Sequence, residues 1–82
     1  MRVIFVLPGR GGGGGAHSVV QETMGLQKLG VDVAIAASQE NLPIFRNIYP
    51  ELEQNRIPLP TFSDDEQLGA AIEGYDLAIA TT

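Results

Sequence analysis

A run of five glycines, residues 11–15, is the segment of this sequence with the clearest capacity for chemistry. Glycine has no Cβ, so its backbone can approach a ligand closely, and free N–H groups at the start of a helix favour phosphate or another oxyanion. Arg10 could act beside the run as an anion clamp, and His17 could donate a hydrogen bond to a phosphate or a sugar hydroxyl. The pattern predicts an anion-binding loop.

Each of these features also has an explanation without a ligand. The glycine run could be a flexible surface turn, Arg10 a solvated loop residue, and His17 a solvated residue in the first turn of a helix. Thr81 and Thr82 follow the last apolar run and could present hydroxyl groups to the same ligand, or they could simply end the segment.

Two phosphate-binding motifs can be compared with the run. A Walker loop requires Gly-Lys-Ser/Thr at the helix start, whereas this sequence has Gly15-Ala16-His17-Ser18, which excludes a P-loop ATPase or GTPase. A dinucleotide fingerprint is formally present as Gly9-x-Gly11-x-x-Gly14, although consecutive glycines satisfy that pattern by chance.

The dinucleotide fingerprint also requires an acidic residue at the end of the second strand, where it binds the ribose. The residues there are Ala36, Ala37 and Ser38. Asp32 lies at the other end of that strand, and Glu40 is already beyond it. A classical NAD site is therefore disfavoured.

The elements that must position the loop alternate between strands and helices. Residues 3–7 (VIFVL) form an apolar run typical of a strand buried on both faces, and residues 16–29 form a helix that Gly30 can end in a left-handed conformation. The remaining predictions are a strand at 31–37, a short helix at 41–49 with Pro43 in its first turn, a proline-containing edge strand at 56–60, a helix from 63 to Gly74 and a strand at 76–80.

This order predicts an α/β fold: a three-layer, Rossmann-like half-domain with a parallel sheet in the strand order 3-2-1-4. The glycine run then joins the carboxyl end of strand one to the start of helix one, beside the switch point between strands one and four. Open α/β sheets bind ligands at that edge.

The acidic segment Ser63-Asp64-Asp65-Glu66 could suggest a metal site or paired carboxylates. It also matches a capping box, in which the Ser63 hydroxyl accepts from the N–H of Glu66 and the Glu66 carboxylate reaches back to Ser63. We expect helix capping here. Leu68, Ala71, Ile72 and Tyr75 then form one stripe that faces the core.

Composition narrows the function classes. Charged residues make up 18% and hydrophobic residues 44%, so the chain is expected to fold. The net charge is −5 and the five basic residues are scattered along the chain. We therefore expect neither a nucleic acid nor an anionic membrane surface as the partner. The absence of cysteine excludes disulfides and thiol chemistry. No apolar run is long enough for a signal peptide or a transmembrane segment, which leads us to expect a cytoplasmic protein.

The sequence resembles the opening of the family-4 retaining glycosyltransferases. The resemblance is carried by the strand at 3–7, by Gly14-Gly15-Ala16-His17-Ser18-Val19-Val20, by Leu26-Gln27-Lys28-Leu29-Gly30-Val31-Asp32-Val33 and by Tyr75-Asp76-Leu77-Ala78-Ile79-Ala80-Thr81. The family pattern is Gly-Gly-Ala-Glu-Arg-Val-Val, then a helix ending in Leu-x-x-x-Gly-His-x-Val. His17 and Val31 depart from it.

The resemblance implies two Rossmann-like domains (the GT-B fold), with residues 1–82 forming the N-terminal part of the acceptor-side domain. It implies transfer of a sugar, with retention, from a nucleotide-diphosphate sugar to a small-molecule, glycan or lipid acceptor, without a cofactor or required metal. Gly13, Gly14 and Gly15 would supply amide donors to the departing diphosphate. Since 82 residues is below the usual domain size of about 100–150 residues, we expect a piece of a larger protein that is inactive alone and that self-associates through its exposed sheet edge.

Two other functions stay open. One is a small Rossmann-like module that binds a nucleotide or a phosphorylated metabolite and performs no chemistry. The other is a half-domain of an NAD(P)-dependent oxidoreductase or epimerase, which the residues at 36–38 disfavour.

Overall fold

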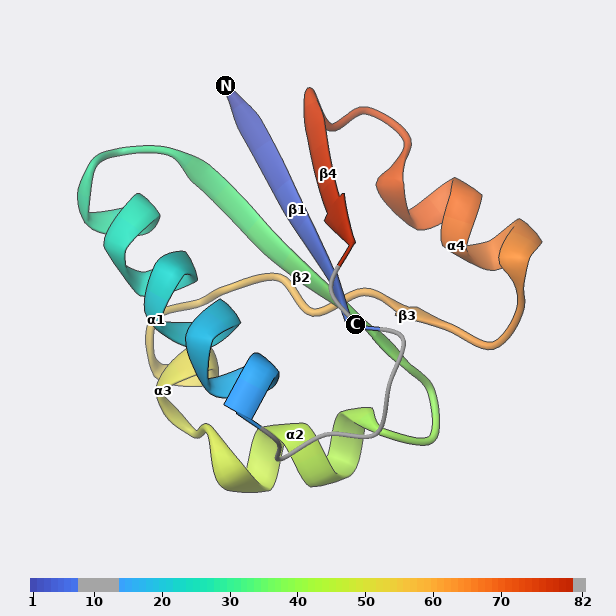
Figure 1. Cartoon of the computed structure of the whole chain (residues 1–82), viewed down its shortest axis with the longest axis horizontal. Helices are drawn as coiled ribbons and strands as arrows, with labels where there is room; N and C mark the ends of the chain where they lie inside the picture. Colours follow the sequence, from blue (N-terminus) through green and yellow to red (C-terminus); the bar gives the residue numbers. More distant parts are fainter. Residues whose placement is uncertain (8–13, 81–82) are drawn as a thin grey trace.

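The computed structural model describes residues 1–7 and 14–80. Within them the strands are β1 (Arg2–Leu7), β2 (Asp32–Ser38), β3 (Thr61–Phe62) and β4 (Leu77–Ala80), and the helices are α1 (Gly14–Lys28), α2 (Leu42–Ile48), α3 (Glu51–Gln54) and α4 (Asp65–Ile72). Figure 1 shows how they are arranged.

The strands form one parallel sheet in the order β3-β2-β1-β4, which confirms the predicted fold class and strand order. β1 lies at the centre, with Phe5 opposite Ile35 of β2 on one side and opposite Ile79 of β4 on the other. Because all strands run in the same direction, their carboxyl ends share one edge of the sheet, here called the carboxyl edge, and their starts share the amino edge.

Alternate residues of β1 and β2 enter two separate cores. Val3, Phe5 and Leu7 pack on one face of the sheet with residues of α1, α2 and α3, whereas Ile4 and Val6 pack on the other face with residues of α4. The molecule therefore has three layers, with α1, α2 and α3 on one side of the sheet and α4 on the other (Figure 1). Both faces of the central strands are buried, as their uninterrupted apolar sequences predict.

Helix α1 ends as predicted. Gly30 has a φ of +84°, and the N–H groups of Gly30 and Val31 donate to the carbonyls of Gln27 and Leu26. This pair of bonds is the Schellman motif, which needs a left-handed residue at this position. Gly74, after α4, is likewise left-handed, at +90°.

The third strand differs from the prediction. The expected strand at 56–60 is replaced by a two-residue strand, Thr61–Phe62, further along the chain. The carbonyls of Pro58 and Pro60 still accept from the N–H groups of Ile35 and Ala37, but a proline has no N–H to return the bond. Regular pairing therefore begins after Pro60.

Two local details at the helices also differ. The short helix α3 follows α2 and was not predicted. The start of α4 is capped by Asp64 and not by Ser63: the Asp64 carboxylate accepts from the N–H of Gln67 at 2.8 Å, and the Gln67 side-chain oxygen accepts from both the N–H and the hydroxyl of Ser63. The capping box is thus shifted by one residue, and Glu66 is not part of it. Of the predicted stripe on α4, Leu68, Ile72 and Tyr75 pack against the core.

Candidate functional site

The carboxyl edge brings together the end of β1, the end of β4 and the start of α1. Ala80 pairs with Val6, and α1 begins at Gly14. The chain leaves β1 toward α1 on one face of the sheet and enters β4 from α4 on the other, so the switch point lies between β1 and β4. Adjacent crossovers diverge at such a point, and ligands of open α/β sheets bind there.

The structure places part of the predicted site at this edge. Gly14 and Gly15 are the first two residues of α1, and His17 follows within the same helical turn. Arg10, Gly13 and Thr81 lie outside the described residues. The described half of the site is therefore the beginning of α1.

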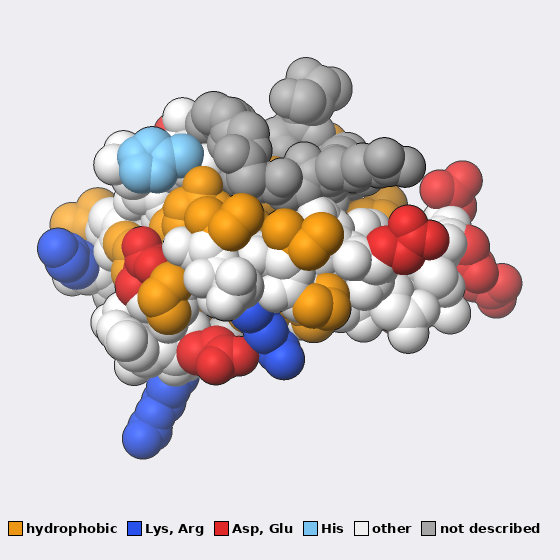
Figure 2. Space-filling view, turned by 90° about the horizontal axis from the view of Figure 1, so that it is seen from below, with side chains coloured by type: hydrophobic (Ala, Val, Ile, Leu, Met, Phe, Trp, Pro, Cys, Tyr) orange, Lys and Arg blue, Asp and Glu red, His pale blue; other side chains and the backbone are white. Residues whose placement is uncertain are grey.

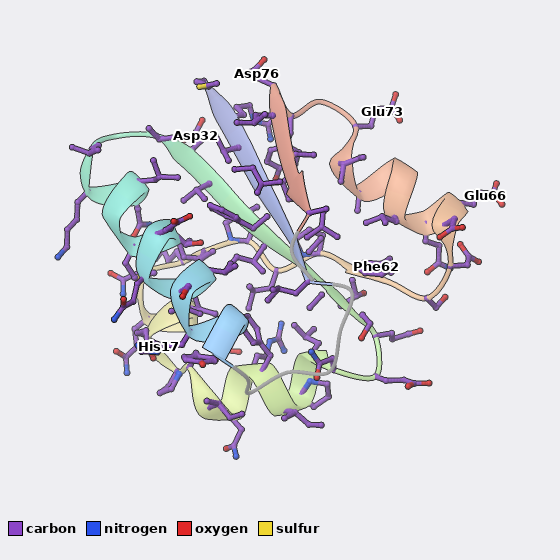
Figure 3. All side chains as sticks on the ribbon, viewed as in Figure 1. His17, Asp32, Phe62, Glu66, Glu73 and Asp76 are labelled. Atoms are coloured by element: carbon purple, nitrogen blue, oxygen red, sulfur yellow. The ribbon has the colours of Figure 1, made fainter. Side chains whose placement is uncertain are left out.

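His17 is exposed and lies between two neighbours. Nε2 of the Gln21 side chain is 3.0 Å from Nε2 of the His17 ring, within hydrogen-bonding distance on the same face of α1. The ring centroid lies 6.3 Å from that of Tyr49, the residue at the end of α2. Figure 3 shows His17 near the start of α1, on the side of α2. The contacts limit the rotation of the imidazole and leave its surface open to a ligand.

The electrostatics of the two long helices differ at their starts. The first turn of α1 contains no acidic residue, whereas that of α4 contains Asp65 and Glu66, preceded by the capping carboxylate of Asp64. The positive end of the helix dipole is thus balanced by the protein's own carboxylates at α4. At α1 none of the first-turn side chains supplies a negative charge, so an anionic ligand would be favoured there.

The acidic segment at the start of α4 has a structural role. Asp64 is used in capping, and the described residues contain no group of three or more histidine, cysteine, aspartate or glutamate side chains arranged to hold a metal ion. None of the described helices combines the length and the apolarity needed to cross a membrane.

The end of β2 lacks the group that an NAD site needs. Ala36 and Ala37 are buried and Ser38 ends the strand, while Asp32 lies at the amino edge, where it pairs in register with Arg2. Figure 3 shows Asp32 at the opposite end of the sheet from Phe62, the last residue of β3. The prediction that Asp32 lies at the end of β2 away from the carboxyl edge is confirmed.

The sequence did not predict that α2 contributes to the surface around the start of α1. Ile44 and Ile48 are 53% and 45% exposed, and the ring of Tyr49 lies near that of His17. Figure 2 views the molecule from the side of α2, and hydrophobic side chains gather there. The spacing of Ile44 and Ile48 places both on one helix face, a signal that was available in the sequence. The contact between Tyr49 and His17 had no such signal, because it depends on the packing of two helices.

Comparisons with protein-family models, with curated proteins and with solved structures find no match to this chain.

Proposed function

We propose that this chain forms the acceptor-side part of a retaining glycosyltransferase that takes its sugar from a nucleotide-diphosphate sugar. The observation that carries the proposal is the position of α1: it starts with two glycines and no acidic residue, at the switch point of a parallel sheet. The resemblance of its sequence to the family-4 glycosyltransferases supplies the chemistry.

In the proposed reaction the bond between the sugar C1 and the diphosphate oxygen breaks, and its electron pair leaves with the diphosphate. The acceptor hydroxyl oxygen forms the new bond to C1 on the same face from which the diphosphate leaves, which retains the configuration, and its proton passes to the departing diphosphate oxygen. Negative charge therefore grows on the diphosphate as the reaction proceeds. Backbone N–H groups at the start of α1 would stabilise that charge, and electrostatic stabilisation of this kind is the main contribution a preorganised site makes.

Gly14 and Gly15 matter in this mechanism because glycine has no side chain. Gly14 and Gly15 add no side chain between the backbone amides and the leaving group. A Cβ at either position would increase the distance between the diphosphate and the helix start. His17, exposed one residue after Ala16, would hydrogen-bond a sugar hydroxyl or a phosphate oxygen.

A binding experiment tests the first step. Backbone amide resonances of the ¹⁵N-labelled chain would be followed by NMR while uridine diphosphate, uridine or NAD is added at millimolar concentration. The expected result is that the diphosphate shifts the amides of Gly14, Gly15 and His17, whereas uridine does not. NAD shifting these amides more strongly than the diphosphate would favour an oxidoreductase half-domain, and no shift at the start of α1 with any of the three would contradict the proposal.

A transfer assay separates the enzyme from a binding module. The chain would be joined to, or supplied with, the donor-side domain that the proposal requires, and sugar transfer from the nucleotide sugar would be followed by mass spectrometry. Retained configuration at C1 is the expected product stereochemistry. Diphosphate binding without any transfer would replace the glycosyltransferase proposal with a nucleotide-binding or phosphate-binding module.

A further inference from the structure

A pocket opens at the amino edge of the sheet, at the end of the molecule opposite to the first turn of α1. Its volume is about 260 Å³, and its polar lining comes from Arg2, Gln27, Asp32, Arg56 and Tyr75. We infer that this pocket binds a small hydroxylated metabolite through its oxyanion group, a phosphate or a carboxylate, using the guanidinium groups of Arg2 and Arg56. The inference is independent of the proposed function, because the two sites share no residue.

Arg2 is held in a fixed position. Its Nη1 donates to the carbonyl of Gly74 at 3.1 Å, and its guanidinium lies over the ring of Tyr75, 4.5 Å from the centroid. These contacts order the side chain before any ligand arrives, which lowers the entropy cost of binding. Since one nitrogen of the guanidinium is used for Gly74, the rest of the group is available for an anion.

Arg56 occupies a position where glycine would be preferred. It has a φ of +57°, and the N–H groups of Arg56 and Ile57 donate to the carbonyls of Glu53 and Leu52. The hydrogen bonds are those of a Schellman motif at the end of α3, where a residue other than glycine is strained.

The strain at Arg56 is not offset by a charge pairing. The side chain is exposed and forms no ion pair with any described residue, in contrast to Arg46, which pairs with Glu53 at 3.1 Å. Arg56 has a strained backbone conformation, and no ion pair of its side chain compensates for the strain. Backbone strain of this kind is often found at functional sites, and the side chain of Arg56 lines the pocket.

The other polar residues restrict the ligand. Gln27 is fixed in the pocket wall, because its Nε2 donates to the carbonyl of Asn55 at 2.7 Å. The Asp32 carboxylate forms no ion pair with a described residue. It would repel a ligand that carries only negatively charged groups, but it would accept a hydrogen bond from a ligand hydroxyl. An oxyanion beside a hydroxylated carbon satisfies both the guanidinium groups and Asp32.

The distribution of charge indicates that an anion would be attracted to this pocket and not to the molecule as a whole. The chain has a net charge of −5 and five basic residues in total, and two of those five line this one pocket. An anion is repelled by the molecule as a whole, so its binding would depend on the direct hydrogen bonds that the guanidinium groups lining the pocket give to phosphate or carboxylate.

The test is an NMR titration of the ¹⁵N-labelled chain with inorganic phosphate, glycerol 3-phosphate, glycerate and glycerol, following the amides of Asp32, Val33 and Arg56. Saturable shifts are expected with at least one anion that carries a hydroxyl, weaker ones with inorganic phosphate, and none with glycerol. Stronger binding of glycerol 3-phosphate identifies a phosphate site, and stronger binding of glycerate a carboxylate site. Arg56→Gln, which keeps the same backbone strain, is expected to raise Kd about tenfold. The matched control Arg46→Gln removes the same charge outside the pocket and should leave Kd unchanged. No saturable shift with any anion, or an equal loss in both variants, would overturn the inference.

Discussion

Arg2 and Asp76, far apart in the chain, exchange two hydrogen bonds at the amino edge of the sheet. The N–H of Arg2 donates to Oδ2 of Asp76 at 2.7 Å, and the N–H of Asp76 donates to the carbonyl of Arg2 at 2.8 Å. Asp76 directly precedes β4, so these bonds fix the point at which β4 joins β1. The turn that returns the chain from α4 to the sheet is attached to the first residue of β1.

Replacing Asp76 by alanine should therefore destabilise the fold. One hydrogen bond to a charged acceptor is lost while the backbone bond remains, and because the site is exposed we expect a loss of about 1 kcal/mol in the free energy of unfolding. Urea denaturation followed by circular dichroism measures it. Asp76→Asn keeps a side-chain oxygen and should recover most of the loss, whereas equal destabilisation by both variants would show that the oxygen is not what matters.

Replacing Arg56 by glycine should stabilise the fold. Glycine adopts the left-handed conformation at the end of α3 without strain, and the expected gain is about 1 kcal/mol. The same urea experiment applies. Arg56→Ala is the matched control, because it removes the charge but keeps the strain, and it should give no comparable gain. Similar stabilisation by both would attribute the effect to charge instead of to the backbone.

A third prediction concerns Thr23, which faces the core from α1. Its side chain is fully buried, and its Oγ1 has no hydrogen-bond partner among the described residues. Because a buried hydroxyl without a partner costs free energy, Thr23→Val, with nearly the same shape, should raise the stability by about 1 kcal/mol. Thermal denaturation is the measurement. Ser18→Val, at an exposed site on the same helix, should have little effect, and a destabilised Thr23→Val would show that the hydroxyl has a partner in solution.

The parts of the fold that sequence predicted correctly are those set by neighbouring residues. Gly30 and Gly74 end their helices because few other residues accept a positive φ, and Pro43 lies in the first turn of α2 because its missing N–H is not needed there. The buried strands followed from apolar runs that both faces of a parallel sheet require. The parallel pairing followed from the short connections between them, and the strand order followed from the usual doubly wound arrangement, which puts the proline-containing third strand at the edge.

The sequence predictions were wrong where contacts between distant residues set an element's bounds, or where two neighbouring residues could fill the same role. β3 begins only at Thr61 because Pro58 and Pro60 have no N–H groups to return the bonds from β2, and how far along the chain β2 would pair was not evident from the sequence. Ser63 and Asp64 can both cap a helix, so the choice between them depends on a single residue of register. α3, with four residues, is too short to leave a periodic pattern. At the candidate site the glycines were evident from sequence, but Tyr49 was not.

The fourth prediction tests the role of the glycines in the first turn of α1. The proposed function predicts that Gly15→Leu abolishes sugar transfer while leaving the protein folded, because a bulky side chain at the start of α1 would separate the helix amides from the diphosphate. Transfer rate and circular dichroism are measured together. Gly25→Ala is the control in the same helix: a Cβ there meets no atom within 4 Å, and alanine favours the helix, so activity should be unchanged. Full activity of Gly15→Leu would show that the first turn of α1 takes no part in the mechanism.

The last prediction concerns β4, which pairs with β1 on one side and with no described strand on the other. Leu77 is 43% exposed and Ala78 and Ala80 are also exposed, and the strand contains no charged residue or proline. Such an edge offers unpaired N–H and carbonyl groups to another chain, so the 82-residue chain should self-associate with increasing concentration.

Light scattering at increasing protein concentration measures this association. Ala78→Lys should suppress it, because a lysine in an exposed edge strand resists pairing with a second copy. Glu73→Lys, at an exposed position just after α4, changes the net charge in the same direction outside the strand and should leave most of the association intact. A wild-type chain that stays monomeric at every concentration would show that the edge of β4 is protected. Equal suppression by both lysines would assign the association to overall charge.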